Sequence, residues 1–210
     1  MTIKNLIISP HADDEVLGMG GTLHYFQVKG EPTHVHYCGI NEKDSVNRPP
    51  REKRINELKS VAKFLGFTWS LNEDNVCNNY VERELMRQIE EVIEKIKPER
   101  IFIPFPSYNQ DHRAVYYASL VATRPHDRTH FIKKVLIYEQ EHPLLWDPKQ
   151  ITPNYFIPID IDKKIQAYHL YDTQVRSYRS PELLKAIAKL RGSSINVPYA
   201  EGFMVYRWVD

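Results

Sequence analysis

The feature that most constrains the fold of this chain is a regular alternation of short apolar segments with amphipathic helical segments. The β-prone segments lie at residues 5–10, 34–38, 67–71, 101–103 and 134–139. Apolar residues at helical spacing occupy the intervals, at residues 15–26, 55–65, 85–96 and 111–122. This alternation favours a mainly parallel sheet with helices on both faces. We therefore predict a Rossmann-like three-layer α/β sandwich.

The C-terminal third of the chain continues this pattern less regularly. Strands are predicted at residues 155–159 and 203–208, and helices at residues 160–171 and 181–190. No repeat, low-complexity segment or linker interrupts the 210 residues, and this length fits one large domain. We expect residues 1–210 to form a single domain.

The charges are almost balanced, with 28 Lys+Arg against 27 Asp+Glu and no basic block. Nucleic acid and anionic membranes both require a concentrated positive field, so we expect neither as a partner. The N-terminus lacks the apolar region of a signal peptide, and no segment is long enough to span a bilayer. We expect a cytoplasmic protein that acts on a small molecule. The 11% aromatic content is compatible with a homo-oligomer without requiring one.

Two polar motifs follow predicted strands at the point where each strand ends. His11-Ala12-Asp13-Asp14 comes directly after the first strand, and Asp111-His112-Arg113 follows residues 101–103 by one loop. Because ligands bind at the carboxyl ends of parallel strands, we expect both motifs in one site. His11, Asp14 and His112 would form a two-histidine, one-carboxylate set that holds Zn²⁺ or Fe²⁺. Asp13, outside this set, is the natural general base.

Plainer interpretations apply to the same residues. A pair of aspartates before a helix is often only an N-cap, and a single histidine is more often structural than a metal ligand. The glycines of Gly18-Met19-Gly20-Gly21 do not come directly after the strand, which argues against a dinucleotide-binding turn. Close packing of the helix against the sheet, or a break in the helix, explains them better. Cys38 and Cys77 form no metal-binding or redox spacing.

The motifs also carry a family resemblance. His11-Ala12-Asp13-Asp14-Glu15 resembles the His-Pro-Asp-Asp-Glu signature of the PIG-L/LmbE-like family of zinc-dependent N-acetylglucosaminyl deacetylases. Residues 111–115 resemble the second motif of that family. Weaker similarities extend the resemblance over essentially the whole chain, at Arg54-x-x-Glu57, Tyr138-Glu139, Tyr171-Asp172-Thr173-Gln174 and Ala200-Glu201-Gly202-Phe203.

The resemblance implies zinc on His11, Asp14 and His112, with Asp13 taking a proton from a water whose pKa zinc lowers from about 15.7 to about 7. The chain departs from the family pattern at two positions. Ala12 replaces the proline of the signature. Asn109 stands where many family members carry a histidine that stabilises the oxyanion. An amide can donate a hydrogen bond to an oxyanion but carries no positive charge, and Tyr108 is an alternative donor.

Residues that could contact the substrate lie near the two motifs. Arg54 and Arg113 would suit the diphosphate of a nucleotide-linked sugar through paired hydrogen bonds. Arg48 and Arg51 are better explained as a solvated helix face. His36 and Asn41 lie at the end of the second predicted strand, where they could also touch the substrate.

We predict a metal-dependent hydrolase that removes the acetyl group from an N-acetylated amino sugar or a sugar conjugate, nucleotide-linked conjugates included. Two alternatives stay open: a metal-dependent amidase acting on another acylated amine, and a metal-retaining sugar-binding protein without turnover. Asp13 speaks against the binding protein, because a pure binder needs no base beside its metal.

Overall fold

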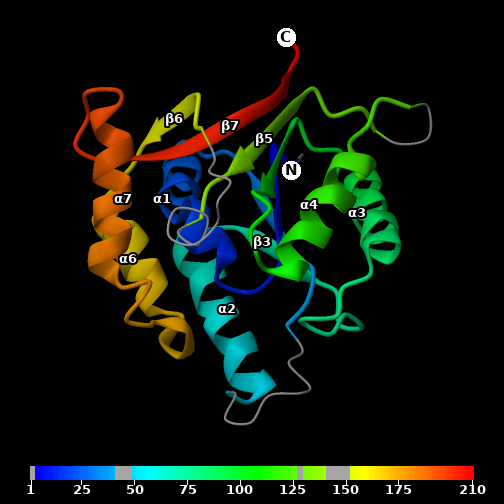
Figure 1. Cartoon of the computed structure of the whole chain (residues 1–210), viewed down its shortest axis with the longest axis horizontal. Coiled ribbons are helices and arrows are strands. Elements are labelled where there is room, and N and C mark those ends of the chain that lie inside the picture. The colour runs from blue at the N-terminus through cyan, green and yellow to red at the C-terminus, as the bar shows by residue number, and fades with distance from the viewer. Residues whose placement is uncertain (1–2, 41–48, 127–129, 141–151) are drawn as a thin grey trace.

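The computed structural model describes residues 3–40, 49–126, 130–140 and 152–210. Within these residues the strands form one sheet in the order β3-β2-β1-β4-β5-β7-β6 (Figure 1). The strands are β1 Asn5–Ser9, β2 Thr33–Tyr37, β3 Thr68–Leu71, β4 Arg100–Pro104, β5 Lys134–Tyr138, β6 Tyr155–Pro158 and β7 Ala200–Trp208. The first five are parallel, and β7 pairs antiparallel with both β5 and β6.

Helices cover both faces of the sheet. One face carries α1 Asp14–Val28, α2 Arg51–Leu65, α6 Ile161–His169 and α7 Pro181–Ser193, and the other carries α3 Glu82–Ile96 and α4 Gln110–Ala122 (Figure 1). The alternation of side chains along β1 supplies both interfaces, since Ile7 lies in the first apolar cluster while Leu6 and Ile8 lie in the second. The predicted three-layer α/β sandwich is confirmed.

The strand order also determines where a ligand site can form. The chain builds outward from β1 in one direction through β2 and β3, and in the other through β4 and β5. The topological switch point therefore falls between β1 and β4, where a crevice opens beyond the carboxyl ends of the strands. Each of the two motifs follows one of these neighbouring strands.

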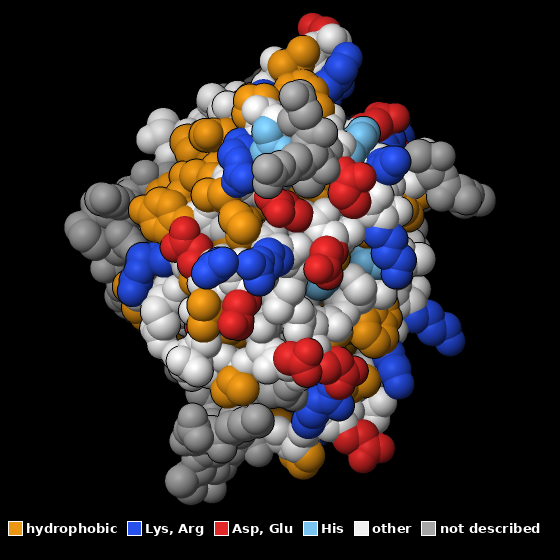
Figure 2. All heavy atoms as spheres, turned by 90° about the vertical axis from the view of Figure 1, so that its right-hand side faces the viewer, with side chains coloured by type: hydrophobic (Ala, Val, Ile, Leu, Met, Phe, Trp, Pro, Cys, Tyr) orange, Lys and Arg blue, Asp and Glu red, His pale blue; other side chains and the backbone are white. Residues whose placement is uncertain are grey.

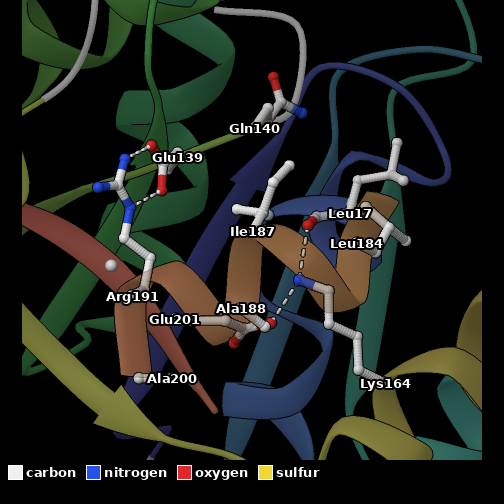
Figure 3. Close-up of a pocket in the computed structure, with 12 residues that line it drawn as sticks. Leu17, Glu139, Gln140, Lys164, Leu184, Ile187, Ala188, Arg191, Ala200 and Glu201 are labelled. Carbon is white, nitrogen blue, oxygen red and sulfur yellow. Dashed lines mark hydrogen bonds and ion pairs between the residues drawn. The ribbon is translucent and has the colours of Figure 1, made fainter. Parts of the chain in front are cut away.

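Helix α1 is broken at Met19, which has φ −150° and ψ 29°. In an unbroken helix the carbonyl of Leu17 would accept from the amide of Gly21. Here the Leu17 carbonyl accepts from Lys164 Nζ at 2.7 Å, and the Gly21 amide donates to Glu201 Oε1 at 3.0 Å. Figure 3 shows the Lys164 and Glu201 side chains meeting at the break, 2.6 Å apart. Two buried, opposite charges thus satisfy the groups that the break exposes.

The glycines around the break permit close packing of α1. A Cβ on Gly18 would clash with the ring of Tyr138 on β5. A Cβ on Gly21 would lie 2.6 Å from Cβ of Ile159, next to β6. Both explanations offered for the Gly18–Gly21 segment therefore hold, since the helix is broken and also packs closely.

The surface is consistent with the balanced composition. Figure 2 shows acidic and basic side chains interspersed on the face that α3 and α4 form. In the described part of the chain, no helix combines the length and the apolar character needed to cross a membrane.

Candidate metal centre

His11, Asp14 and His112 come together at the switch point. His11 follows β1, Asp14 begins α1, and His112 lies in the first turn of α4. Asp14 Oδ2 lies 3.3 Å from His11 Nδ1 and 3.3 Å from His112 Nε2. Donor atoms bound to one tetrahedral zinc at about 2.0–2.2 Å lie about 3.4 Å apart. The three side chains are therefore spaced so that one metal ion could contact all of them.

Asp111 fixes the orientation of His11. Its Oδ2 accepts a hydrogen bond from His11 Nε2 at 2.9 Å and from the backbone amide of Asn78 at 2.6 Å. Because Nε2 is used in this way, Nδ1 is the nitrogen that faces Asp14 and that would be left to bind a metal. A carboxylate behind a ligating histidine is a common second layer of metal sites, where it sets the tautomer and increases the basicity of the ligand.

The electrostatics of the three residues also suit a cation. Burial opposes charge on Asp14, but the two neighbouring imidazoles outweigh it and hold the pKa of this carboxyl well below its usual range. Burial also opposes charge on His11, yet its hydrogen bonds to Asp111 and Asp14 raise its pKa well above the usual value. The second oxygen of Asp14 accepts from Gln140 Nε2 at 2.7 Å, which leaves Oδ2 facing the imidazoles.

Asp13 lies beside this group in a strained backbone conformation, with φ 143°. Non-glycine residues avoid this region, and such strain concentrates at functional sites. Asp13 makes no side-chain capping hydrogen bond to α1, so the N-cap interpretation does not explain it. Its Oδ2 instead lies 3.1 Å from Arg179 Nη2. Burial nevertheless raises the pKa of Asp13, because it outweighs the guanidinium.

The Glu15 carboxylate stabilises the strained backbone of Asp13 by a hydrogen bond. Its Oε2 accepts the amide of Asp13 at 3.1 Å, and its Oε1 accepts from the Tyr171 hydroxyl at 2.7 Å. Burial, with a smaller contribution from the Asp13 charge, raises the pKa of Glu15 to about 7. The signature segment is therefore tied to Tyr171, just after α6, through a fully buried carboxyl and phenol.

A cavity of about 180 Å³ opens over the centre. Besides the three candidate ligands and Asp13, its walls include Arg54, Tyr108, Asn109 and two further arginines, Arg176 and Arg179. Asn109 caps α4, since its Oδ1 accepts from the amide of Asp111 at 2.8 Å. Its Nδ2 is therefore the atom of this side chain that is left to donate a hydrogen bond. Tyr108 is 50% exposed at the rim.

Arg54 lines the cavity but is already engaged by the protein. One terminal nitrogen donates to the Ala12 carbonyl at 2.6 Å, and the other lies 3.5 Å from Glu57 Oε2. Arg54 therefore supports the backbone of the first motif.

The remaining predicted substrate residues do not meet at the cavity. The described residues that line it include neither His36 nor Arg113. His36 is buried and hydrogen-bonded to Ser70, and Arg113 is exposed and turns back to the carbonyls of Ser107 and Tyr108. Asn41 lies outside the described residues.

Four residues of the centre had no predicted role: Asp111, Gln140, Arg176 and Arg179. Asp111 was named only as a neighbour of His112. Gln140 directly follows the predicted strand at 134–139, so the strand-end argument that found His11 applies to it as well. The two arginines come from a C-terminal loop between α6 and α7, and no spacing in the sequence connects them to residues 11–14.

The His11, Asp14 and His112 group lies beside a strained aspartate at the switch point of a doubly wound sheet, and its donor atoms are close enough together to hold one metal ion. Residues 6–123 match the family model of PIG-L, described as GlcNAc-PI de-N-acetylase. The chain therefore belongs to the PIG-L family.

Several solved structures share the fold of this chain. The conserved protein TT1542 from Thermus thermophilus is 23% identical, with a TM-score of 0.82 over 99% of this chain and 96% of its own. The N,N'-diacetylchitobiose deacetylase from Pyrococcus horikoshii is 22% identical, with a TM-score of 0.78 over 98% and 84%. GalB, the 4-carboxy-2-hydroxymuconate hydratase from Pseudomonas putida KT2440, is 19% identical, with a TM-score of 0.80 over 99% and 98%. At these identities the likeness concerns the fold alone.

Proposed function

We propose that this protein is a divalent-metal-dependent deacetylase acting on an N-acetylated amino sugar or a sugar conjugate. The observation that carries the proposal is the spacing of His11, Asp14 and His112 around one point, with the carboxylate of Asp13 beside it. Family membership supports the acetyl group as the target. The fold alone does not select the reaction, because a hydratase shares it.

His11, Asp14 and His112 would hold the cation, and this ligand set accepts both Zn²⁺ and Fe²⁺. When bound, the metal supplies a Lewis acid that lowers the pKa of water and polarises the acetamide carbonyl. Asp111 and Gln140 keep two of the ligands in orientation through the hydrogen bonds described above.

Asp13 acts as the general base that takes a proton from the attacking water. Its raised pKa makes it a better proton acceptor than an ordinary aspartate. Arg179 holds one of its oxygens, so the other is the one that receives the proton. The same carboxyl then returns the proton to the departing amine as the tetrahedral intermediate collapses to acetate.

Asn109 donates Nδ2–H to the developing oxyanion. Its Oδ1 is fixed by the helix cap, and this pre-orients the donor without a cost at the moment of reaction. Tyr108, at the exposed rim, is the alternative donor.

The test is acetate release from N-acetylated free, phosphorylated and nucleotide-linked sugars by metal-loaded protein, with a chelated sample as the control. We expect chelator-sensitive release that Asp13→Asn abolishes while the metal content is retained. Asp162→Asn, a matched change at an exposed aspartate, should behave as wild type. Full activity of Asp13→Asn would remove Asp13 as the base. Sugar binding without release across the panel would favour the binding protein, and neither binding nor release would favour an amidase for another acylated amine.

A further inference from the structure

Three of the described residues that line the cavity are arginines, and two of them are engaged by partners in the protein. Arg54 is held by the Ala12 carbonyl and Glu57. Arg179 is held by Asp13 and by Gln174 Oε1, each at 3.1 Å. Arg176 differs from both. Among the described residues its side chain makes no hydrogen bond or ion pair. Its Nε is buried without an acceptor, as is Nε of Arg54, but the described residues engage neither of its terminal nitrogens, whereas they engage both of those of Arg54.

A buried guanidinium nitrogen without an acceptor is costly, because it has given up hydrogen bonds to water. Native proteins keep such groups rarely, and a ligand that supplies the acceptor is one explanation. Arg176 is placed to meet a ligand, since its side chain forms part of the cavity wall above the metal centre.

The charges of the cavity indicate the sign of that ligand. The two carboxylates among the described lining residues are already matched, Asp13 by Arg179 and Asp14 by the imidazoles of His11 and His112. No carboxylate among the described lining residues is left to face Arg176. A bound metal would add further positive charge. The part of the cavity at Arg176 therefore favours an anion.

The loop that carries Arg176 is tied to the catalytic group. The amide of Arg179 donates to the carbonyl of Arg176 at 3.1 Å, which closes a tight turn over residues 176–179. Arg179 reaches Asp13 from one end of this turn, while Arg176 lines the cavity from the other. A group bound by Arg176 would thus be held at a fixed position relative to Asp13.

We propose that the substrate carries an acidic group, a carboxylate or a phosphate monoester, which Arg176 binds while the acetamide lies at the metal centre. The planar fork of arginine donors matches either group with two parallel hydrogen bonds. This inference rests on the proposed function, because it assigns a substrate class to the same cavity.

The experiment compares kcat/KM for N-acetylglucosamine, its 6-phosphate and N-acetylmuramic acid in wild type, Arg176→Met and Arg176→Lys. The phosphate and the carboxylate sugar distinguish the two sources of the acidic group. We expect wild type to prefer at least one acidic sugar. The ratio of its kcat/KM to that of the neutral sugar should fall by about 10- to 100-fold in Arg176→Met, because a charge-assisted hydrogen-bond pair is lost.

Arg176→Lys should give an intermediate ratio, since lysine keeps the charge but not the fork. Arg87→Met removes an exposed arginine from α3, outside the cavity, and should keep the wild-type ratio. An equal loss for acidic and neutral sugars in Arg176→Met would overturn the proposal, as would an unchanged ratio.

A binding measurement separates this inference from the proposed function. Calorimetric titration of the metal-loaded protein with glucosamine 6-phosphate and muramic acid needs no turnover. If no sugar is deacetylated, binding that is weakened by Arg176→Met and not by Arg87→Met would support the acidic subsite while removing the deacetylase. Equal binding by wild type and Arg176→Met would overturn the subsite even if deacetylation is observed.

Discussion

Replacing Asp111 by asparagine tests whether this residue controls the metal centre through His11. The carboxylate is fully buried and accepts from three N–H groups, those of His11 Nε2, Asn78 and Tyr80, at 2.9, 2.6 and 3.4 Å. The amide can keep the first two bonds with its oxygen, but its NH₂ then faces the amide of Tyr80. The shape of the side chain is thus preserved while its charge and one acceptor are removed.

The magnitude follows from the loss of that charge. A hydrogen bond to a charged group contributes about 1.5–3 kcal/mol against about 0.5–1.5 for a neutral one. The difference, about 1–1.5 kcal/mol, makes Nδ1 of His11 a poorer ligand and corresponds to a loss of metal affinity of about 5- to 13-fold. This overlaps the lower end of the roughly 10- to 100-fold range typical of such second-layer carboxylates.

The assay is competition for zinc with a chromogenic chelator, using wild type, Asp111→Asn and the exposed control Asp162→Asn. Circular dichroism of the metal-free variants establishes that each is folded. An Asp111→Asn protein that is folded and binds zinc as tightly as wild type would refute the role of Asp111 and the assignment of Nδ1 as the ligand atom.

Further predictions concern the broken helix, the oxyanion donor and a buried histidine. Lys164→Met should lower the free energy of unfolding by about 3–5 kcal/mol, because Glu201 remains buried without its counter-charge, and Lys164→Met/Glu201→Gln should recover part of it in urea titrations. Asn109→Ser keeps a helix cap but removes the amide donor, so kcat should fall while thermal stability is retained; a wild-type kcat would move the role elsewhere. Burial, with the neighbouring His34, lowers the pKa of His36 from 6.5 to about 4. Between these two pH values the unfolded state binds more protons than the folded state, so the free energy of unfolding should fall by up to about 3 kcal/mol as the pH drops from 6.5 to 4. The measurement compares metal-free wild type with metal-free His36→Gln, and an equal pH dependence of the two proteins would contradict this prediction.

The layer architecture could be predicted from the sequence because hydrophobic periodicity is a local signal. The alternation of strands and helices fixed the parallel core of the sheet and placed His11 and His112 at one edge of it. The antiparallel pairing of β7 with β5 and β6 was not predicted, because neighbour order among the last strands depends on long-range packing rather than on local pattern. The break at Met19 was anticipated from its glycines, but its partners Lys164 and Glu201 were not.

The candidate site could likewise be predicted only in part from the sequence. Residues next to strand ends were found, since topology alone brings them together. Arg176 and Arg179 were missed, because their positions depend on how a C-terminal loop folds back over the cavity. The orientation of side chains was also out of reach. His36 and Arg113 are close to the site in sequence terms, yet one points to Ser70 and the other to its own helix start.

The charged pair at the break in α1 determines whether the first half of the chain could keep its structure without the second half. The family-matched region ends at residue 123, and it contains all three candidate metal ligands. Yet the polar groups exposed by the break in α1 are bonded to Lys164 and Glu201 from the second half. Gln140, which orients Asp14, also lies in the second half, and the carboxylate of the preceding residue, Glu139, pairs with Arg191 (Figure 3). A fragment that stops after α4 would contain every motif residue but would lack the side chains that hydrogen-bond the Leu17 carbonyl and the Gly21 amide at the helix break. Removal of the second half of the chain should therefore destabilise a centre whose three candidate ligands all lie in the first half.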